Sequence, residues 1–147
     1  MENRIKCEWM QKLGEELIAC HPSLLAIRDN GIRIVYLESD SQRLKGGSYV
    51  YGCCEKINPK NKWAIDYDYS VTFYIRNIAY MDESQLQILM LHELLHICVK
   101  VDGQNNLHLS CTPHDVEDFR EIIEEYGLDW AEPKYKQITM EALDEQG

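Results

Sequence analysis

The sequence lacks the long apolar segments and the basic surface that membranes or nucleic acids would require. It contains no apolar run of about 18 residues, the length that suggests a membrane-spanning helix. Lysine and arginine together number 15, against 25 aspartates and glutamates, and the formal net charge of the 147 residues is −10. Because nucleic acids and anionic lipids attract basic surfaces, neither is expected as a partner.

Export signals and linkers are also missing. The first twenty residues mix charged and apolar side chains and have no apolar core of a secretory signal peptide. The six cysteines are irregularly spaced, so we expect a reduced, cytoplasmic protein and no disulfide framework. Without repeats or a stretch rich in proline and glycine, the sequence predicts one domain over residues 1–130 and a short tail over residues 131–147.

Helical patterns occur at both ends of the chain and near its middle. A first helix is predicted over residues 2–20, where apolar residues recur at helical spacing. Residues 82–100 form a second predicted helix, which begins with Asp82 and Gln85 at the spacing of a capping box. A C-terminal helix is predicted to begin at Thr112, because threonine is a good N-cap and a proline follows it.

Strand patterns fill the region between the first two helices. Residues 32–39, 48–57 and 69–76 are rich in β-branched and aromatic side chains. The glycine pair Gly46–Gly47 predicts a hairpin between the first two of these segments. The sequence therefore predicts a single compact α+β domain with a small, three-stranded, mostly antiparallel sheet.

The stretch LMLHELLHICVK, residues 89–100, places three ionisable side chains in the most apolar predicted helix. His92 and His96 are four residues apart, so both imidazoles leave the same helix face and can reach one metal ion. Glu93 lies beside that face, where it can act on a metal-bound water as a general base. Leucines surround these residues, and burial of three ionisable groups without partners is costly. A metal site is therefore expected.

A catalytic zinc ion needs a third protein ligand and one open position. The candidates downstream are His108, Cys111, His114 and Asp115. His114 is favoured, because it lies in the first turn of a packed helix, whereas His108 lies in a polar loop. Asp115 remains open as a ligand, as a partner of a ligand, or as part of a capping box.

Two other functions are compatible with these residues. The first is a structural zinc site in a non-catalytic protein, closed by His92, His96, Cys111 and His114. In such a site Glu93 would have no role. The second is metal-dependent hydrolysis of a bond other than a peptide bond, since the motif activates water for any electrophile.

The motif HELLHI, followed by HDVEDF, resembles the phage metallopeptidases, which are zincin-like proteins of bacteriophages, prophages and some prokaryotes. The resemblance extends from about Val35 to Tyr126. It implies a zincin-like domain with His92, His96 and His114 as ligands of one zinc ion, Glu93 as catalyst, and a peptide or protein substrate. Small zincins lay an extended substrate along the edge strand before the metal helix, which implies residues 69–76 as the substrate strand. The sequence does not indicate the oligomeric state.

Overall fold

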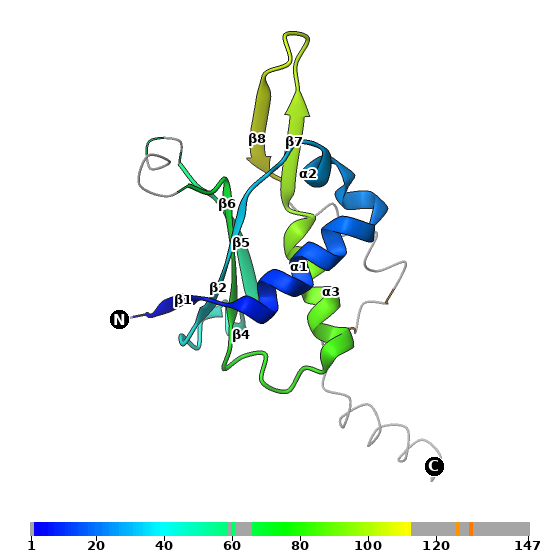
Figure 1. Ribbon diagram of the computed structural model, residues 1–147. Helices are drawn as coiled ribbons and strands as arrows, with labels where there is room; N and C mark the ends of the chain where they lie inside the picture. The colour runs from blue at the N-terminus through cyan, green and yellow to red at the C-terminus, as the bar shows by residue number, and fades with distance from the viewer. Residues whose placement is uncertain (1, 59, 61–65, 113–125, 127–129, 131–147) are drawn as a thin grey trace.

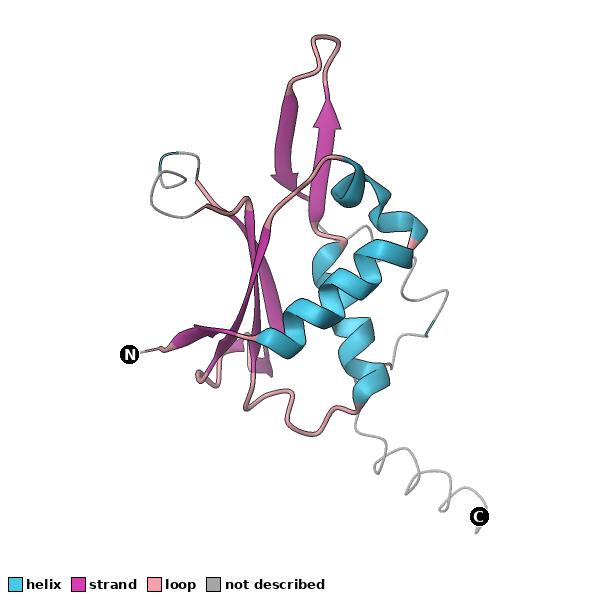
Figure 2. Ribbon diagram, in the orientation of Figure 1, coloured by secondary structure: helices cyan, strands magenta, loops and turns pink. Residues whose placement is uncertain are grey.

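The computed structural model describes residues 2–58, 60, 66–112, 126 and 130 and has a mixed α+β architecture (Figure 1). Its described helices are α1 (Glu8–Cys20), α2 (Leu25–Asp29) and α3 (Glu83–Leu94), with a short 3-10 turn at Pro22–Leu24. Its described strands are β1 (Arg4–Lys6), β2 (Ile34–Ser39), β3 (Leu44–Lys45), β4 (Ser48–Tyr49), β5 (Gly52–Lys56), β6 (Tyr69–Tyr74), β7 (Ile97–Val101) and β8 (Leu107–Cys111). Figure 2 shows α1 and α3 lying against one side of the main sheet. The α+β prediction is confirmed.

The main sheet has four strands in the order β1-β2-β6-β5, rather than the three strands that we predicted. Strands β2 and β6 are parallel, and the two outer pairings are antiparallel. The predicted hairpin between residues 32–39 and 48–57 is wrong, because β6 lies between them. All but one residue of β6 are buried, as expected for a central strand covered on both faces. The Gly46–Gly47 turn instead closes the small β3–β4 hairpin, with φ angles of 59° and 80°.

The N-terminal helix is shorter than predicted, since its first residues form the extra strand β1. Arg4–Lys6 pair with Leu37–Ser39, and the Cys7 backbone N–H donates to the Tyr36 carbonyl at 3.0 Å. These long-range bonds outweigh the helical pattern of the sequence. Further along α1, a Cβ on Gly14 would lie 2.5 Å from the Tyr36 ring, so glycine is what allows α1 to approach β2 this closely.

Helix α3 begins as predicted and ends earlier. Both bonds of the capping box are present: the Gln85 N–H donates to Asp82 at 2.9 Å, and the Asp82 N–H donates to Gln85 at 3.0 Å. The helix ends at Leu94, whereas the prediction extended it to residue 100. The chain instead continues as β7, which pairs with β8 in a region expected to be a loop. Alternating apolar residues in both segments favour this hairpin, which projects from the body of the molecule (Figure 1).

The base of the β7–β8 hairpin is tied to the main sheet by Tyr69, the first residue of β6. Its side chain is fully buried, and its hydroxyl donates to the Ser110 carbonyl at 2.8 Å. This bond places the hairpin at the end of the sheet that lies next to the last turn of α3.

Two further predictions fall outside the described residues. These are the C-terminal helix expected after Thr112 and the tail expected over residues 131–147. Among the helices that the structure does describe, none combines the length and the apolar character needed to cross a lipid bilayer.

Candidate metal centre

The HELLH motif lies where α3 ends and the hairpin begins. His92 and Glu93 occupy the last turn of α3, and His96 follows the C-cap residue Leu95. Leu95 keeps helical backbone angles, φ −69° and ψ −16°, so His96 still lies one turn after His92. The two rings meet edge to face, with their centroids 5.3 Å apart. The predicted spacing of the two imidazoles is therefore present, although the helix stops between them.

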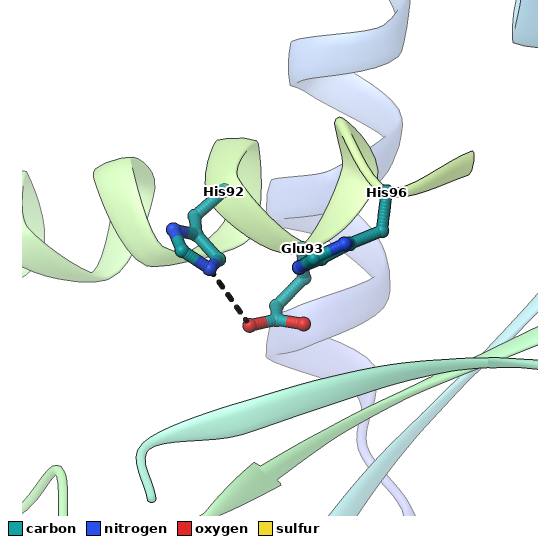
Figure 3. A group of neighbouring side chains, drawn as sticks. All are labelled: His92, Glu93 and His96. Atoms are coloured by element: carbon teal, nitrogen blue, oxygen red, sulfur yellow. Dashed lines mark ion pairs between the residues drawn. The ribbon is translucent and has the colours of Figure 1, made fainter. Parts of the chain in front are cut away.

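Glu93 lies with the two histidines in a compact group of potential ligands. One nitrogen of each histidine and one carboxylate oxygen all lie within 4.8 Å of one another. The Nε2 atom of His92 is 3.8 Å from Oε1 of Glu93. Figure 3 shows the side chains of His92 and Glu93, at the end of α3, and of His96, just after it, converging on one another. Imidazole and carboxylate are the ligand types that zinc and similar divalent ions accept. The residues present therefore fit a metal ion.

Glu93 is buried within the group, between two half-buried histidines. Glu93 is 3% exposed as a whole residue, and the flanking Leu91 and Leu94 are buried as well. Strand β5 covers the carboxylate side chain: a Cβ added to Gly52 would lie 3.4 Å from Cγ of Glu93. Our sequence reasoning did not identify Gly52 as a residue of this site. A glycine inside a predicted strand was the available signal, because it often marks a close approach.

The backbone of Thr112 holds His96 in a defined orientation. The Nδ1 atom of His96 is 2.7 Å from the Thr112 carbonyl oxygen, and the Thr112 N–H donates to the His96 carbonyl at 2.6 Å. A carbonyl oxygen can only accept a hydrogen bond, so Nδ1 is the protonated nitrogen. In the neutral ring the lone pair then lies on Nε2, which is the arrangement of a metal-binding histidine.

Trp130 is a second neighbour of the site that the sequence analysis did not identify. Its ring centroid lies 6.1 Å from that of His92. The side-chain amide of Gln85 donates to the Trp130 carbonyl at 3.1 Å, which anchors this residue beside α3. Gln85 and His92 are seven residues apart and therefore lie on the same face of the helix. The Trp130 indole thus packs beside the His92 imidazole.

The other predicted ligands lie elsewhere or outside the described residues. His108 is on β8, with its side chain 64% exposed and its Nε2 atom 2.9 Å from Oδ2 of Asp102. Cys111 ends the same strand and is not a member of the ligand group found among the described residues. His114 and Asp115 lie outside the residues that the structure describes. The structure therefore brings together His92, Glu93 and His96 and leaves the third ligand open.

Comparison with known proteins places the chain in a family. Searches of curated proteins and of solved structures each gave no significant match. One protein family, described as "Putative phage metallopeptidase", has a model that matches residues 3–142. The matched range includes the whole main sheet, α3 and the β7–β8 hairpin. The resemblance carried by the HELLHI and HDVEDF motifs is thereby confirmed, and the chain belongs to the putative phage metallopeptidase family.

Proposed function

We propose that the protein is a zinc-dependent metallopeptidase with a zincin-like domain. His92, His96 and His114 would hold one zinc ion per chain, and Glu93 would be the catalytic base. The observation that carries this proposal is a buried glutamate beside two histidines, with their ligand atoms within 4.8 Å of one another. When bound, zinc lowers the pKa of a coordinated water and polarises the carbonyl that is attacked.

The two described histidines would present their ring nitrogens to the metal. The hydrogen bond between Nδ1 of His96 and the Thr112 carbonyl favours Nε2 as the ligand atom. His114 follows Thr112 by two residues in the sequence, a distance that an extended chain spans with about 7 Å. This short connection to the residue that holds His96 supports His114 as the third ligand.

Glu93 would move the proton during hydrolysis. One carboxylate oxygen would accept a proton from the attacking water and later return it to the nitrogen of the leaving amine. Its 3% exposure supports this role, because few bulk water molecules can screen or compete with the carboxylate. A closed, structural site remains less well supported, since Cys111 is absent from the described ligand group.

The order of strands in the main sheet changes which strand could bind a substrate peptide. Residues 69–76 were expected to bind the substrate, but β6 lies between β2 and β5 and has no open edge. Strand β5 is the edge strand beside Glu93. Backbone hydrogen bonds of residues 51 and 57 join β5 to β6, so by alternation Gly52 and Cys54 direct their N–H and C=O groups outward. The Cys54 carbonyl already accepts from the Cys111 thiol, which leaves Gly52 as the open position. We propose that an extended peptide pairs with this edge near Gly52.

The cysteines support the expected location of the protein. Their irregular spacing in the sequence favours free thiols, which a reducing cytoplasm would maintain. A cytoplasmic location is therefore part of the proposed function.

Glu93→Gln tests the proposed function most directly. The zinc-loaded wild-type protein should cleave denatured proteins, and mass spectrometry should find new N-termini. The variant should keep its zinc and fold but lose cleavage by about 10²–10⁴-fold, the usual contribution of a general base. A zinc-loaded wild type that cleaves nothing would contradict the peptidase proposal and leave the metal site standing. A variant with the wild-type rate would remove Glu93 as the base.

A further inference from the structure

Two thiols meet where the edge strand β5 contacts β8. Cys54 lies in β5, and Cys111 is the last residue of β8. The Cys111 thiol donates to the Cys54 carbonyl oxygen, with its Sγ atom 3.8 Å from that oxygen, so the two cysteines are direct neighbours across β5 and β8. Cys111 is exposed to solvent, whereas Cys54 is half-buried beneath it. The pair therefore combines an accessible thiol with a second, half-buried cysteine whose backbone it contacts.

We propose that Cys54 and Cys111 form a peroxide-sensitive thiol pair, in which Cys111 attacks the oxidant and Cys54 closes a disulfide. An accessible thiol beside a resolving thiol is the arrangement found at protein redox sites. This modification site is separate from the proposed hydrolysis, and no step of it uses the metal.

The electrostatics around Cys111 favour the attacking role. The neighbouring Cys54 side chain, together with Lys56, lowers the pKa of Cys111 to about 6. The Cys111 side chain, together with burial, raises the pKa of Cys54. The thiolate is the nucleophilic form, so at neutral pH Cys111 is the sulfur prepared to react. Cys54 then retains its proton until Cys111 has been oxidised.

The reaction is balanced with hydrogen peroxide as the oxidant. The Cys111 thiolate attacks one peroxide oxygen, the O–O bond breaks, and hydroxide leaves, which gives a sulfenic acid. The Cys54 sulfur then loses its proton and attacks the Cys111 sulfur. The S–S bond forms as the S–O bond breaks, and the second oxygen leaves as water. In total the two thiols supply two electrons, and one peroxide becomes two waters.

Cys53 provides a matched comparison within the same strand. It is adjacent to Cys54, but its side chain lies on the opposite face of β5. Its sulfur is 3.4 Å from Oε1 of Glu55 and 3.6 Å from the Tyr74 hydroxyl. Burial raises the pKa of Cys53. The geometry therefore assigns the disulfide to Cys54 and not to its neighbour.

The disulfide would connect two segments that border the candidate metal centre. Cys54 is two residues from Gly52, which packs against Glu93. Cys111 directly precedes Thr112, whose carbonyl accepts from His96. Oxidation would thus fix the edge strand to the segment that orients one histidine.

The test is peroxide treatment of the metal-free, full-length protein, followed by alkylation and peptide mass spectrometry. Adjacent cysteines share a peptide, so the variant Cys53→Ser identifies the partner: it should still form a link to Cys111. Cys54→Ser should form no such link and should instead leave a Cys111 sulfenic acid that dimedone traps. Circular dichroism checks that each variant is folded, and the wild type unfolded in urea should lose the pairing preference.

Three outcomes would overturn the proposal. The first is a wild-type protein that remains fully alkylated after peroxide. The second is a folded Cys53→Ser protein that forms no link to Cys111, or a link from Cys111 to Cys98 in the folded wild type. The third is a folded Cys54→Ser protein without a dimedone adduct at Cys111, since that residue would then not be the attacking sulfur.

Discussion

Among the residues that the structure describes, two histidine–carboxylate pairs differ both in the distance between their charged groups and in their exposure to water. On the β7–β8 hairpin, His108 and Asp102 are 2.9 Å apart, and their side chains are 64% and 36% exposed. In α3, His92 and Glu93 are 3.8 Å apart, and their side chains are 14% and 4% exposed. The closer pair is thus the one in water. Distance alone would therefore select the exposed pair, whereas burial selects His92 and Glu93.

Burial is what distinguishes the two pairs. Water screens an exposed ion pair, so the His108–Asp102 contact contributes little to stability. The carboxylate of Glu93 lies among apolar neighbours and close to a second imidazole, where charge interactions are stronger. A metal ion is therefore expected at the buried pair and not at the exposed one.

The largest expected effect is the loss of metal in His96→Ala. Removal of this imidazole should weaken zinc binding by about 100-fold or more, since even residues that only support metal ligands contribute about 10- to 100-fold. Calorimetric titration and elemental analysis measure the affinity and the zinc content. His108→Ala is the matched control and should bind zinc as the wild type does. The opposite result would show that the exposed pair holds the metal.

Gly52→Ala tests whether β5 is what shields Glu93. The new methyl group would lie 3.0 Å from the Thr72 carbonyl oxygen, 3.2 Å from the Phe73 ring and 3.4 Å from Glu93. Such crowding should lower the free energy of unfolding by about 1–3 kcal/mol, measured by denaturant titration. Gly103→Ala is the control, because nothing lies within 4 Å of its added Cβ. Equal stability of the two variants would show that β5 packs less tightly on the site.

Tyr69→Phe tests how much the hydrogen bond between β6 and the β7–β8 hairpin stabilises the hairpin. It removes the hydroxyl that donates to the Ser110 carbonyl at 2.8 Å in the buried core. The loss should be about 1 kcal/mol, the usual net value of one hydrogen bond. Amide hydrogen exchange should become faster in β7 and β8 than in the main sheet. Tyr49→Phe, at an exposed position, should leave the exchange unchanged. Uniform acceleration across the protein would contradict a local role for Tyr69.

The smallest expected effect concerns the exposed pair. Hydrogen bonds from His108 and from the backbone N–H groups of Gln104 and Asn106 lower the pKa of Asp102 from 3.8 to about 2. Because the folded-state pKa is depressed, its contribution to hairpin stability is present above pH 3.8 and disappears as pH falls toward 2. NMR shifts of the hairpin-tip amides should follow this transition, and Asp102→Asn should abolish it. A transition that also changes the amides of α3 would mean that the two pairs are coupled.

The sequence predicted those features that depend on neighbouring residues. The capping box of Asp82 and Gln85, the strand at β6 and the grouping of His92, Glu93 and His96 all have short-range signals. The errors in the main sheet came from long-range pairing, whereas the end of α3 was misplaced because the local β7–β8 hairpin was missed. Strand β1 forms by pairing with β2, which lies more than thirty residues away in the sequence. The order of the strands in the main sheet depends on the same kind of long-range contact. The contact between Gly52 and Glu93 also joins residues that are far apart in the sequence. The sequence therefore revealed a glycine within a predicted strand but not the side chain that packs against it.

The two hydrogen bonds between His96 and Thr112 have a consequence for where the chain can change in length. Both groups lie at the base of the hairpin, so the bonds close a loop whose tip is residues 102–106. An insertion at the tip would leave the Thr112 carbonyl opposite His96, and longer loops cost little additional entropy. A single residue inserted within β8 would shift the register and place another carbonyl there. Family members are therefore expected to vary in length at the tip and to keep the strands constant.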